Sequence, residues 1–143
     1  MVIVWGEVLW DRFPDGDQLG GAPSNVAWHL AGLGGAVQLV TATGADADGD
    51  RARARLADRG VELDAIAAAL PGARAIVYGT LAQRTPAGKA ALDAALAAAS
   101  PRVLRVCDPN LRGSAPSADD DRAQAAALAA AVVVKLNHRE VDQ

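Results

Sequence analysis

Short apolar runs alternate with longer amphipathic segments along the chain. The apolar runs are rich in β-branched residues and too short for helices, which predicts buried strands at Val2–Trp5, Val37–Ala42, Ala75–Tyr78, Val103–Cys107 and Val132–Leu136. The segments between them predict helices at Ser24–Leu33, Arg51–Arg59, Ala87–Ala99 and Asp119–Ala131. Because strands that alternate with helices form right-handed crossovers, the pattern predicts an α/β fold with a mostly parallel sheet covered by helices.

The length and composition fit one domain. The chain has 143 residues, of which 51% are hydrophobic, and it contains neither an internal repeat nor a long linker, so we expect a single domain over residues 1–143. The formal net charge is −3 and the basic residues are scattered among acids, which argues against nucleic-acid and membrane-surface partners. Cys107 is the single cysteine, and no apolar run is long enough to span a membrane. We therefore expect a cytoplasmic protein without disulfides.

Polar residues follow directly after the predicted strands. They occupy Gly6–Asp11, Thr43–Asp46, Gly79–Thr80, Asp108–Arg112 and Asn137–Glu140. Ligands of open parallel sheets bind at the carboxyl ends of the strands, and these positions supply carboxylates, amides, a guanidinium and glycines. The set suits a polyhydroxylated, phosphorylated or metal-chelated ligand. For any single position, an ordinary turn or helix-cap residue is the alternative.

Three familiar glycine or aspartate motifs are excluded. Gly32–Gly35 ends a helical pattern and lacks the spacing of a dinucleotide fingerprint, so we interpret it as a helix terminus. Gly44 and Gly49 have the separation of a Walker loop, but the lysine that should follow is missing. Asp46–Gly49 resembles the start of a calcium loop, yet Ala57 stands where the closing glutamate is needed.

The histidines and one row of arginines have simpler interpretations. His29 and His138 have no cysteine or histidine nearby at metal-ligand spacing. Arg51, Arg55 and Arg59 share one face of a predicted helix and alternate with aspartates, which is typical of a solvated face.

Six motifs follow one another over nearly the whole chain. They are Gly6–Asp11, Leu19–Ala27, Gly44–Gly49, Gly79–Arg84, Asp108–Arg112 and Lys135–Glu140. In this order they resemble the PfkB, or ribokinase-like, sugar kinases, and most of all the fructokinase branch. The resemblance implies a three-layer α/β/α sandwich in which ATP and Mg²⁺ serve to phosphorylate a hydroxyl of a sugar such as fructose.

The resemblance also implies roles for a first group of residues, at the sugar. Asp11 would accept hydrogen bonds from sugar hydroxyls, and Asn25 would hold another hydroxyl. Gly20 and Gly21 would form a hinge under the sugar, which agrees with the freedom of glycine to adopt conformations that a Cβ penalises.

A second group would lie near the phosphates. Asn137 and Glu140 match the family's Asn-x-x-Glu motif, and the resemblance gives Glu140 an indirect role at Mg²⁺. Asn110 and Arg112 would lie near the same centre. The alternatives are a surface arginine after a turn for Arg112 and a helix-start carboxylate for Glu140.

Two departures from the family qualify the expected activity. The family's lid of strands should follow Arg59–Asp64, but this segment leads straight toward the third predicted strand. The Gly-Ala-Gly-Asp motif, which carries the catalytic aspartate, should follow well after Asn137 and is not in this sequence. We therefore expect the sugar-binding portion of the fold, incomplete at the C-terminus, with no catalytic residue and inactive alone.

Other hypotheses remain open beside a partial kinase. One is a non-catalytic sugar-binding or regulatory remnant of the kinase fold. A nucleotide-binding oxidoreductase is disfavoured because the dinucleotide fingerprint is missing. A sheet that ends after its fifth strand exposes an edge and apolar helix faces, which favours homo-oligomers.

Overall fold

The computed structural model describes residues 1–63, 69–110 and 118–137. Its main sheet has five strands in the order β4-β1-β5-β6-β7, and every pairing is parallel. The strands are β1 (Val2–Trp5), β4 (Val37–Val40), β5 (Ala75–Tyr78), β6 (Leu104–Cys107) and β7 (Val133–Val134). The five predicted strands are thus confirmed, with ends that differ by a few residues.

Helices connect these strands, as the sequence predicts. They are α1 (Ala22–Gly32), α2 (Ala47–Asp58), α4 (Pro86–Ala98) and α5 (Ala118–Ala129), with short 3-10 helices η1 (Leu70–Gly72) and η2 (Leu81–Arg84). The Asp46 carboxylate accepts a hydrogen bond of 2.8 Å from the backbone N–H of Gly49, so this aspartate caps α2. The predicted helix terminus at Gly32–Gly35 is also confirmed, because α1 ends there and Gly34 has a φ of 78°.

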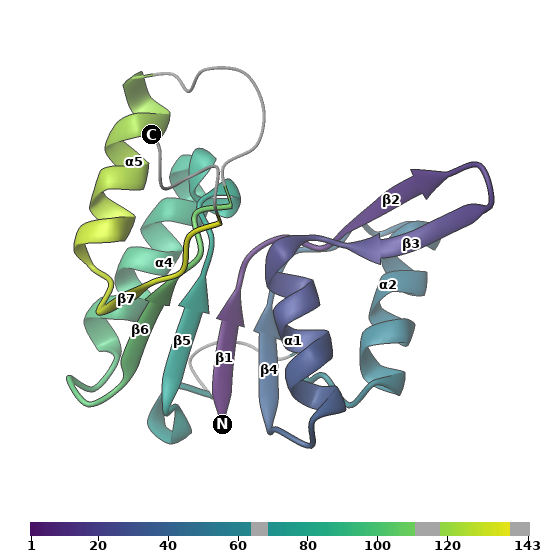
Figure 1. The fold of residues 1–143 in the computed structure, drawn as a ribbon, viewed down its shortest axis with the longest axis horizontal. Coiled ribbons are helices and arrows are strands. Elements are labelled where there is room, and N and C mark those ends of the chain that lie inside the picture. The colour runs from purple at the N-terminus through teal and green to yellow at the C-terminus, as the bar shows by residue number, and fades with distance from the viewer. Residues whose placement is uncertain (64–68, 111–117, 138–143) are drawn as a thin grey trace.

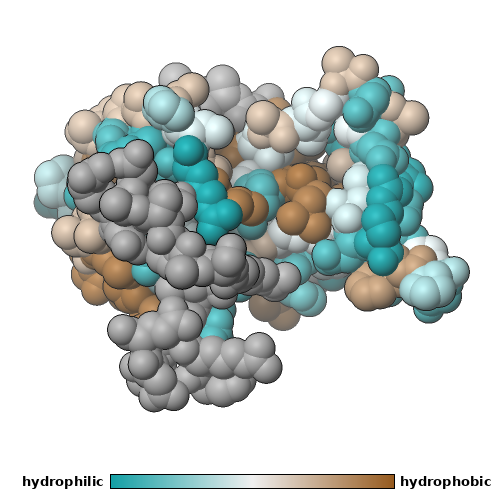
Figure 2. Space-filling model, turned by 90° about the horizontal axis from the view of Figure 1, so that it is seen from above, coloured by the Kyte–Doolittle hydropathy of each residue, from teal (hydrophilic) through white to brown (hydrophobic). Residues whose placement is uncertain are grey.

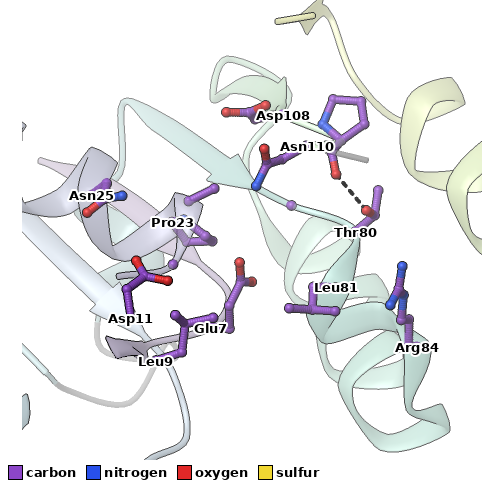
Figure 3. A pocket seen from close by; sticks show the side chains of 14 residues that line it. Glu7, Leu9, Asp11, Pro23, Asn25, Thr80, Leu81, Arg84, Asp108 and Asn110 are labelled. Carbon is purple, nitrogen blue, oxygen red and sulfur yellow. Dashed lines mark hydrogen bonds between the residues drawn. The ribbon is translucent and has the colours of Figure 1, made fainter. Parts of the chain in front are cut away.

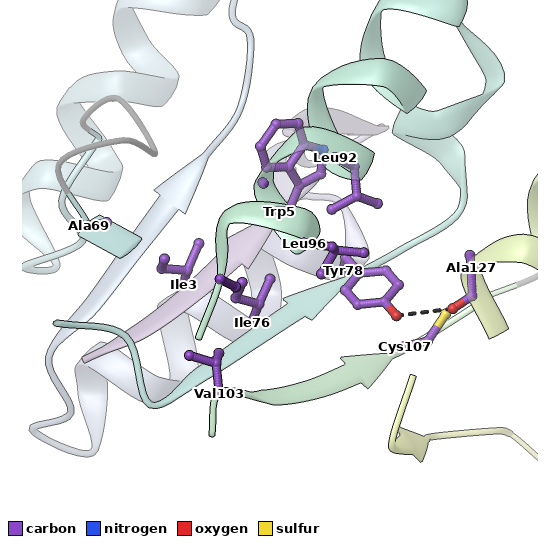
Figure 4. Packing of buried hydrophobic residues seen from close by; sticks show 12 residues of the cluster. Ile3, Trp5, Ala69, Ile76, Tyr78, Leu92, Leu96, Val103, Cys107 and Ala127 are labelled. Carbon is purple, nitrogen blue, oxygen red and sulfur yellow. Dashed lines mark hydrogen bonds between the residues drawn. The ribbon is translucent and has the colours of Figure 1, made fainter. Parts of the chain in front are cut away.

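The sheet separates two hydrophobic clusters. Ile3 and Trp5 pack on one face with Leu92 of α4, whereas Val4 between them packs on the other face with Leu56 of α2. This alternation is the two-residue period of a strand that is buried on both faces. Figure 1 shows α1 and α2 at one end of the sheet and α4 and α5 at the other, and Figure 4 shows the cluster around Trp5.

A buried hydrogen bond ties α5 to this cluster. The hydroxyl of Tyr78, a fully buried residue, donates to the carbonyl oxygen of Ala127 at 3.0 Å (Figure 4). Ala127 lies in the last turn of α5, where carbonyl groups lack partners within the helix. Burial raises the pKa of Tyr78 to about 12, because the anionic form of the phenol is disfavoured there.

A hairpin that the strand pattern does not predict projects from the sheet. It consists of β2 (Leu9–Phe13) and β3 (Gly16–Gly20), which pair antiparallel and form a separate sheet (Figure 1). Sequence analysis placed Leu9–Asp11 in the polar segment after the first strand and predicted no strand in residues 9–20. Most side chains of β2 are exposed, so the run lacks the continuous apolar character that marks the buried strands.

Charged residues connect this hairpin to α2. Arg51 of α2 pairs with Asp17 at 2.8 Å and with Asp48 at 3.1 Å, and Arg12 of the hairpin pairs with the same two carboxylates. The hydrogen bond from Arg51 is the main reason that the pKa of Asp17 lies below its usual range. The Arg51 guanidinium also lies 4.0 Å from the centre of the Trp10 ring. Arg51 thus lies on an exposed face, as predicted, and in addition pairs with the hairpin.

The described sheet ends at β7. Val133 and Val134 of this strand are 43% and 40% exposed, and Val132 before them is 72% exposed, so the predicted open edge is apolar. Within the described ranges, no helix combines the length and the apolar character that crossing a bilayer requires.

Candidate functional site

A cavity of about 150 Å³ lies beyond the carboxyl ends of β1, β5 and β6. One wall comes from the hairpin and the start of α1, and the facing wall comes from η2 and the residues after β6 (Figure 3). We call it the central cavity. Figure 2 views the molecule from this side, where hydrophobic patches lie among hydrophilic side chains. The position is the one at which open parallel sheets bind ligands.

Asp11 reaches the cavity from β2 because a glycine stands beside it. A Cβ at Gly20 would collide with the Asp11 carboxylate and come within 3.0 Å of Leu9. Asp11 therefore keeps its orientation only while residue 20 lacks a side chain. The absence of a Cβ at Gly20 thus leaves space for the Asp11 carboxylate of the paired strand β2.

Gly21 is required for a different reason. Its φ is 104°, a conformation that residues with side chains rarely adopt. A Cβ there would also lie 2.6 Å from the carbonyl oxygen of Glu7. The chain turns sharply at this point from the hairpin into α1, which brings the first turn of the helix to the cavity.

The first turn of α1 presents Asn25 to the central cavity. Pro23 occupies an early helical position, where its fixed φ suits the helix and its missing N–H costs nothing. The Ser24 hydroxyl donates to the carbonyl oxygen of Gly20 at 2.5 Å. Asn25 lines the cavity, and its amide has no hydrogen-bond partner within the described part of the chain. It is therefore available to a ligand.

The facing wall joins the ends of β5, β6 and β7. The Thr80 hydroxyl donates to the carbonyl oxygen of Pro109 at 2.7 Å (Figure 3). The Asp108 carboxylate, 13% exposed, pairs with Lys135 at 3.1 Å. Asn110 follows with a φ of 46°, in the left-handed region that asparagine tolerates better than most residues. This strained residue lines the cavity.

The lining of the central cavity includes both hydrogen-bond acceptors and hydrogen-bond donors. Glu7, Asp11 and Asp108 supply carboxylates, Asn25 supplies an amide, and Arg84 supplies a guanidinium. Alternating donors and acceptors suit a polyhydroxylated ligand. The volume is below the roughly 300–1,000 Å³ of sites for drug-sized molecules, so a small ligand fits better than a nucleotide.

The predicted site residues have different outcomes. Asp11, Gly21, Asn25 and Asn110 line the central cavity, and Gly20 lies behind Asp11. Asn137 follows β7 and is not among the described residues that line the cavity. Arg112 and Glu140 lie outside the described residues. The roles that the resemblance gives to all eight residues stay predictions.

Four polar lining residues fall within segments that sequence analysis named, but it gave none of them a role of its own. Glu7 and Asp108 follow β1 and β6, Thr80 follows β5, and Arg84 ends η2. The position after a strand is a signal for the first three, but it does not separate a ligand contact from a turn residue. Glu7 is distinguished by a feature that only the structure reveals. Its Oε2 atom is buried and has no hydrogen-bond partner, which is rare in folded proteins.

Comparisons with known proteins agree with the motifs. The family model described as "pfkB family carbohydrate kinase" matches residues 16–78. A search of curated proteins found no match. Among solved structures, an uncharacterized sugar kinase from Pyrococcus horikoshii superposes with a TM-score of 0.81 at 17% identity, over 99% of this chain and 67% of that one.

Two fructokinases are similar in the same way. The apo enzyme from Vibrio cholerae O395 gives a TM-score of 0.80 at 21% identity, over 99% of this chain and 65% of that one. The Xylella fastidiosa enzyme with bound ATP gives a TM-score of 0.80 at 22% identity, over 99% of this chain and 62% of that one. The chain thus spans 62–67% of the length of these three structures. The fold is the ribokinase-like α/β sandwich, and the resemblance to the PfkB carbohydrate kinases is confirmed.

Proposed function

We propose that this chain, which shares the motifs and the fold of the PfkB carbohydrate kinases, is the sugar-binding part of an ATP-dependent sugar kinase. The proposed substrate is a monosaccharide such as fructose, bound in the central cavity. The observation that carries the proposal is the convergence of Asp11, Gly21 and Asn25 on one small polar cavity, although they come from a hairpin strand, a turn and a helix.

Two residues of the wall formed by the hairpin and α1 would make different contacts with the sugar. The Asp11 carboxylate accepts hydrogen bonds from hydroxyl groups, and the Asn25 amide both donates and accepts. Because the carboxylate cannot donate, it orients the hydroxyls that face it. A polar group left unmatched in such a site costs about 1–3 kcal/mol, so two fixed partners distinguish a sugar from a deoxygenated analogue.

ATP and Mg²⁺ enter as further proposals. The Xylella fastidiosa fructokinase was solved with bound ATP, which supports ATP as the phosphate donor. Among the side chains that the structure describes, no three acidic, histidine or cysteine groups are placed to hold a metal ion. Glu140, with Arg112, remains the proposed contact to metal and phosphates, and we derive no step through the metal.

A non-catalytic sugar-binding protein is the second candidate. It requires only the cavity at the ends of β1, β5 and β6, which the described residues assemble. The two candidates predict the same sugar binding and differ in nucleotide binding. Cytoplasmic location and self-association stay predictions from the sequence.

Titration calorimetry with fructose and with ATP-Mg²⁺ tests the proposal. We expect fructose binding in the wild-type chain and its loss in Asp11→Asn, which removes the charge and keeps the shape. Asp15→Asn is the matched control, because Asp15 lies exposed in the turn of the same hairpin and does not line the cavity. Binding of fructose alone favours the sugar-binding candidate. Equal fructose affinity in Asp11→Asn and wild type would refute the site.

A further inference from the structure

A groove of about 470 Å³ lies between β3, α1 and α2. Figure 1 shows these elements together, with the hairpin above the two helices. We call it the β3–α1–α2 groove. Most of the described residues that line it are polar, and its volume lies within the range of sites for small organic molecules.

A row of three arginines on α2 passes this groove. Arg51, Arg55 and Arg59 follow one another at intervals of about one helical turn. Arg51 pairs with Asp17 of the hairpin, and the Arg59 guanidinium lies 5.1 Å from the centre of the Trp28 ring of α1. Arg55 stands between them, lines the groove, and has no hydrogen bond or ion pair within the described part of the chain. Because Arg55 is exposed, its guanidinium is available to a ligand.

The other elements of the groove add further unpaired polar groups. Gln18 of β3 and Asn25 of α1 carry amides, and His29 of α1 carries an imidazole. All three residues are exposed, and their side chains make no hydrogen bond to another described residue. These groups therefore reach solvent in the groove, and the amides can donate to an anion that pairs with Arg55.

The balance of charge in the groove favours an anion with a single charge. Asp17 is the one carboxylate among the described lining residues, and both Arg12 and Arg51 pair with it. Arg55 is then the one guanidinium or ammonium group of the described lining, and its charge is uncompensated. A carboxylate matches this charge, and its two oxygens fit the N–H fork of a guanidinium. A phosphate dianion would leave a negative charge uncompensated near Asp17.

We propose that the β3–α1–α2 groove binds a small organic carboxylate with a planar apolar body. The carboxylate pairs with Arg55 and accepts hydrogen bonds from the amides of Gln18 and Asn25. The body packs on Trp28, which is partly exposed in the groove. The inference does not rest on sugar binding, although Asn25 lines both the groove and the central cavity.

Benzoate and benzamide are matched probes, because they share the ring and the planar head group and differ in charge. Titrations of the full chain at constant ionic strength are followed by amide chemical shifts in NMR, without sugar. Benzoate should bind about tenfold more tightly than benzamide, the difference expected for a charge-assisted pair. Phenyl phosphate, a dianion at about pH 8, should bind less tightly than benzoate. The shifts should centre on Gln18, Asn25 and His29.

Variants separate this site from a general effect of positive charge. Arg55→Gln should reduce the affinity for benzoate to that for benzamide, and Arg55→Lys, which keeps the charge but not the fork, should give an intermediate affinity. Arg102→Gln is the matched control, because Arg102 is also exposed but does not line the groove. It should leave the affinity for benzoate unchanged.

Several outcomes would overturn the inference. They are equal affinity for benzoate and benzamide, tighter binding of phenyl phosphate than of benzoate, and equal losses in Arg55→Gln and Arg102→Gln. Shifts confined to Thr80 and Asp108 would place the probe in the central cavity and reject the groove. If Arg55→Gln does not fold, Gln18→Ala should weaken benzoate binding about fivefold, the loss of one hydrogen bond, and unchanged affinity there would also reject the site.

Discussion

Replacing Gly21 by alanine should destabilise the protein strongly, because two separate penalties act at this residue. Its backbone has a φ of 104° and a ψ of 130°, and holding a residue with a Cβ in such a region costs about 1–3 kcal/mol. The new Cβ would also lie 2.6 Å from the carbonyl oxygen of Glu7 and 3.2 Å from the Ser24 hydroxyl oxygen. Overpacking against backbone adds about 1–3 kcal/mol. The sum, about 2–6 kcal/mol, is a large part of the 5–15 kcal/mol that stabilises a typical domain.

Gly34→Ala is the matched control for this experiment. Gly34 also has a positive φ, 78°, but a Cβ there would meet nothing within 4 Å. Gly34→Ala should therefore lose only about 1–2 kcal/mol of stability, the cost of placing a residue with a Cβ in a left-handed conformation. Urea unfolding followed by circular dichroism measures both variants. Equal losses in Gly21→Ala and Gly34→Ala would refute the claim that residue 21 is pressed against the backbone of Glu7.

Three further predictions concern the hairpin, the cavity and the core. Gly20→Ala should cost only about 0.5–1.5 kcal/mol of stability, because the Asp11 side chain can rotate away, but it should abolish sugar binding; retained binding with normal affinity would contradict the placement of Asp11. Arg51→Ala should speed hydrogen exchange at the hairpin amides, with a smaller difference from wild type at high salt, since the ion pairs and the contact with Trp10 are lost; unchanged exchange would argue against this attachment. The raised pKa of Tyr78 means that the unfolded chain releases the phenolic proton first, so stability should fall as the pH rises from about 10 to about 12, and Tyr78→Phe should lack that part of the fall. At neutral pH, Tyr78→Phe should lose about 1 kcal/mol of unfolding free energy with the hydrogen bond to Ala127. If the stability of both proteins falls equally between about pH 10 and 12, the alkaline loss does not come from Tyr78.

The main sheet was predictable because its strands are buried on both faces. Runs such as Val2–Trp5 and Ala75–Tyr78 are apolar without interruption, and the helices between them keep a clear period. The hairpin was not predicted, because the side chains of Leu9–Phe13 are mostly exposed and the strand therefore lacks an apolar run. The turn residues Pro14-Asp15 do indicate a hairpin, but a search for apolar strand runs alone does not take them into account.

The candidate site was predictable in part for similar reasons. Asp11, Gly21 and Asn25 belong to motifs with a family resemblance, and all three line the cavity. Glu7 differs, because one of its carboxylate oxygens is buried without a hydrogen-bond partner, a condition that arises only from tertiary packing. No local pattern of residues encodes such a contact.

The most direct test of the account is the calorimetric titration of fructose into the wild-type chain, Asp11→Asn and Asp15→Asn. The account predicts binding in the wild type and in Asp15→Asn, and an affinity lower by roughly tenfold or more in Asp11→Asn, as the loss of a hydrogen bond to a charged group implies. The same affinity in all three proteins would contradict the claim that the central cavity is a sugar site.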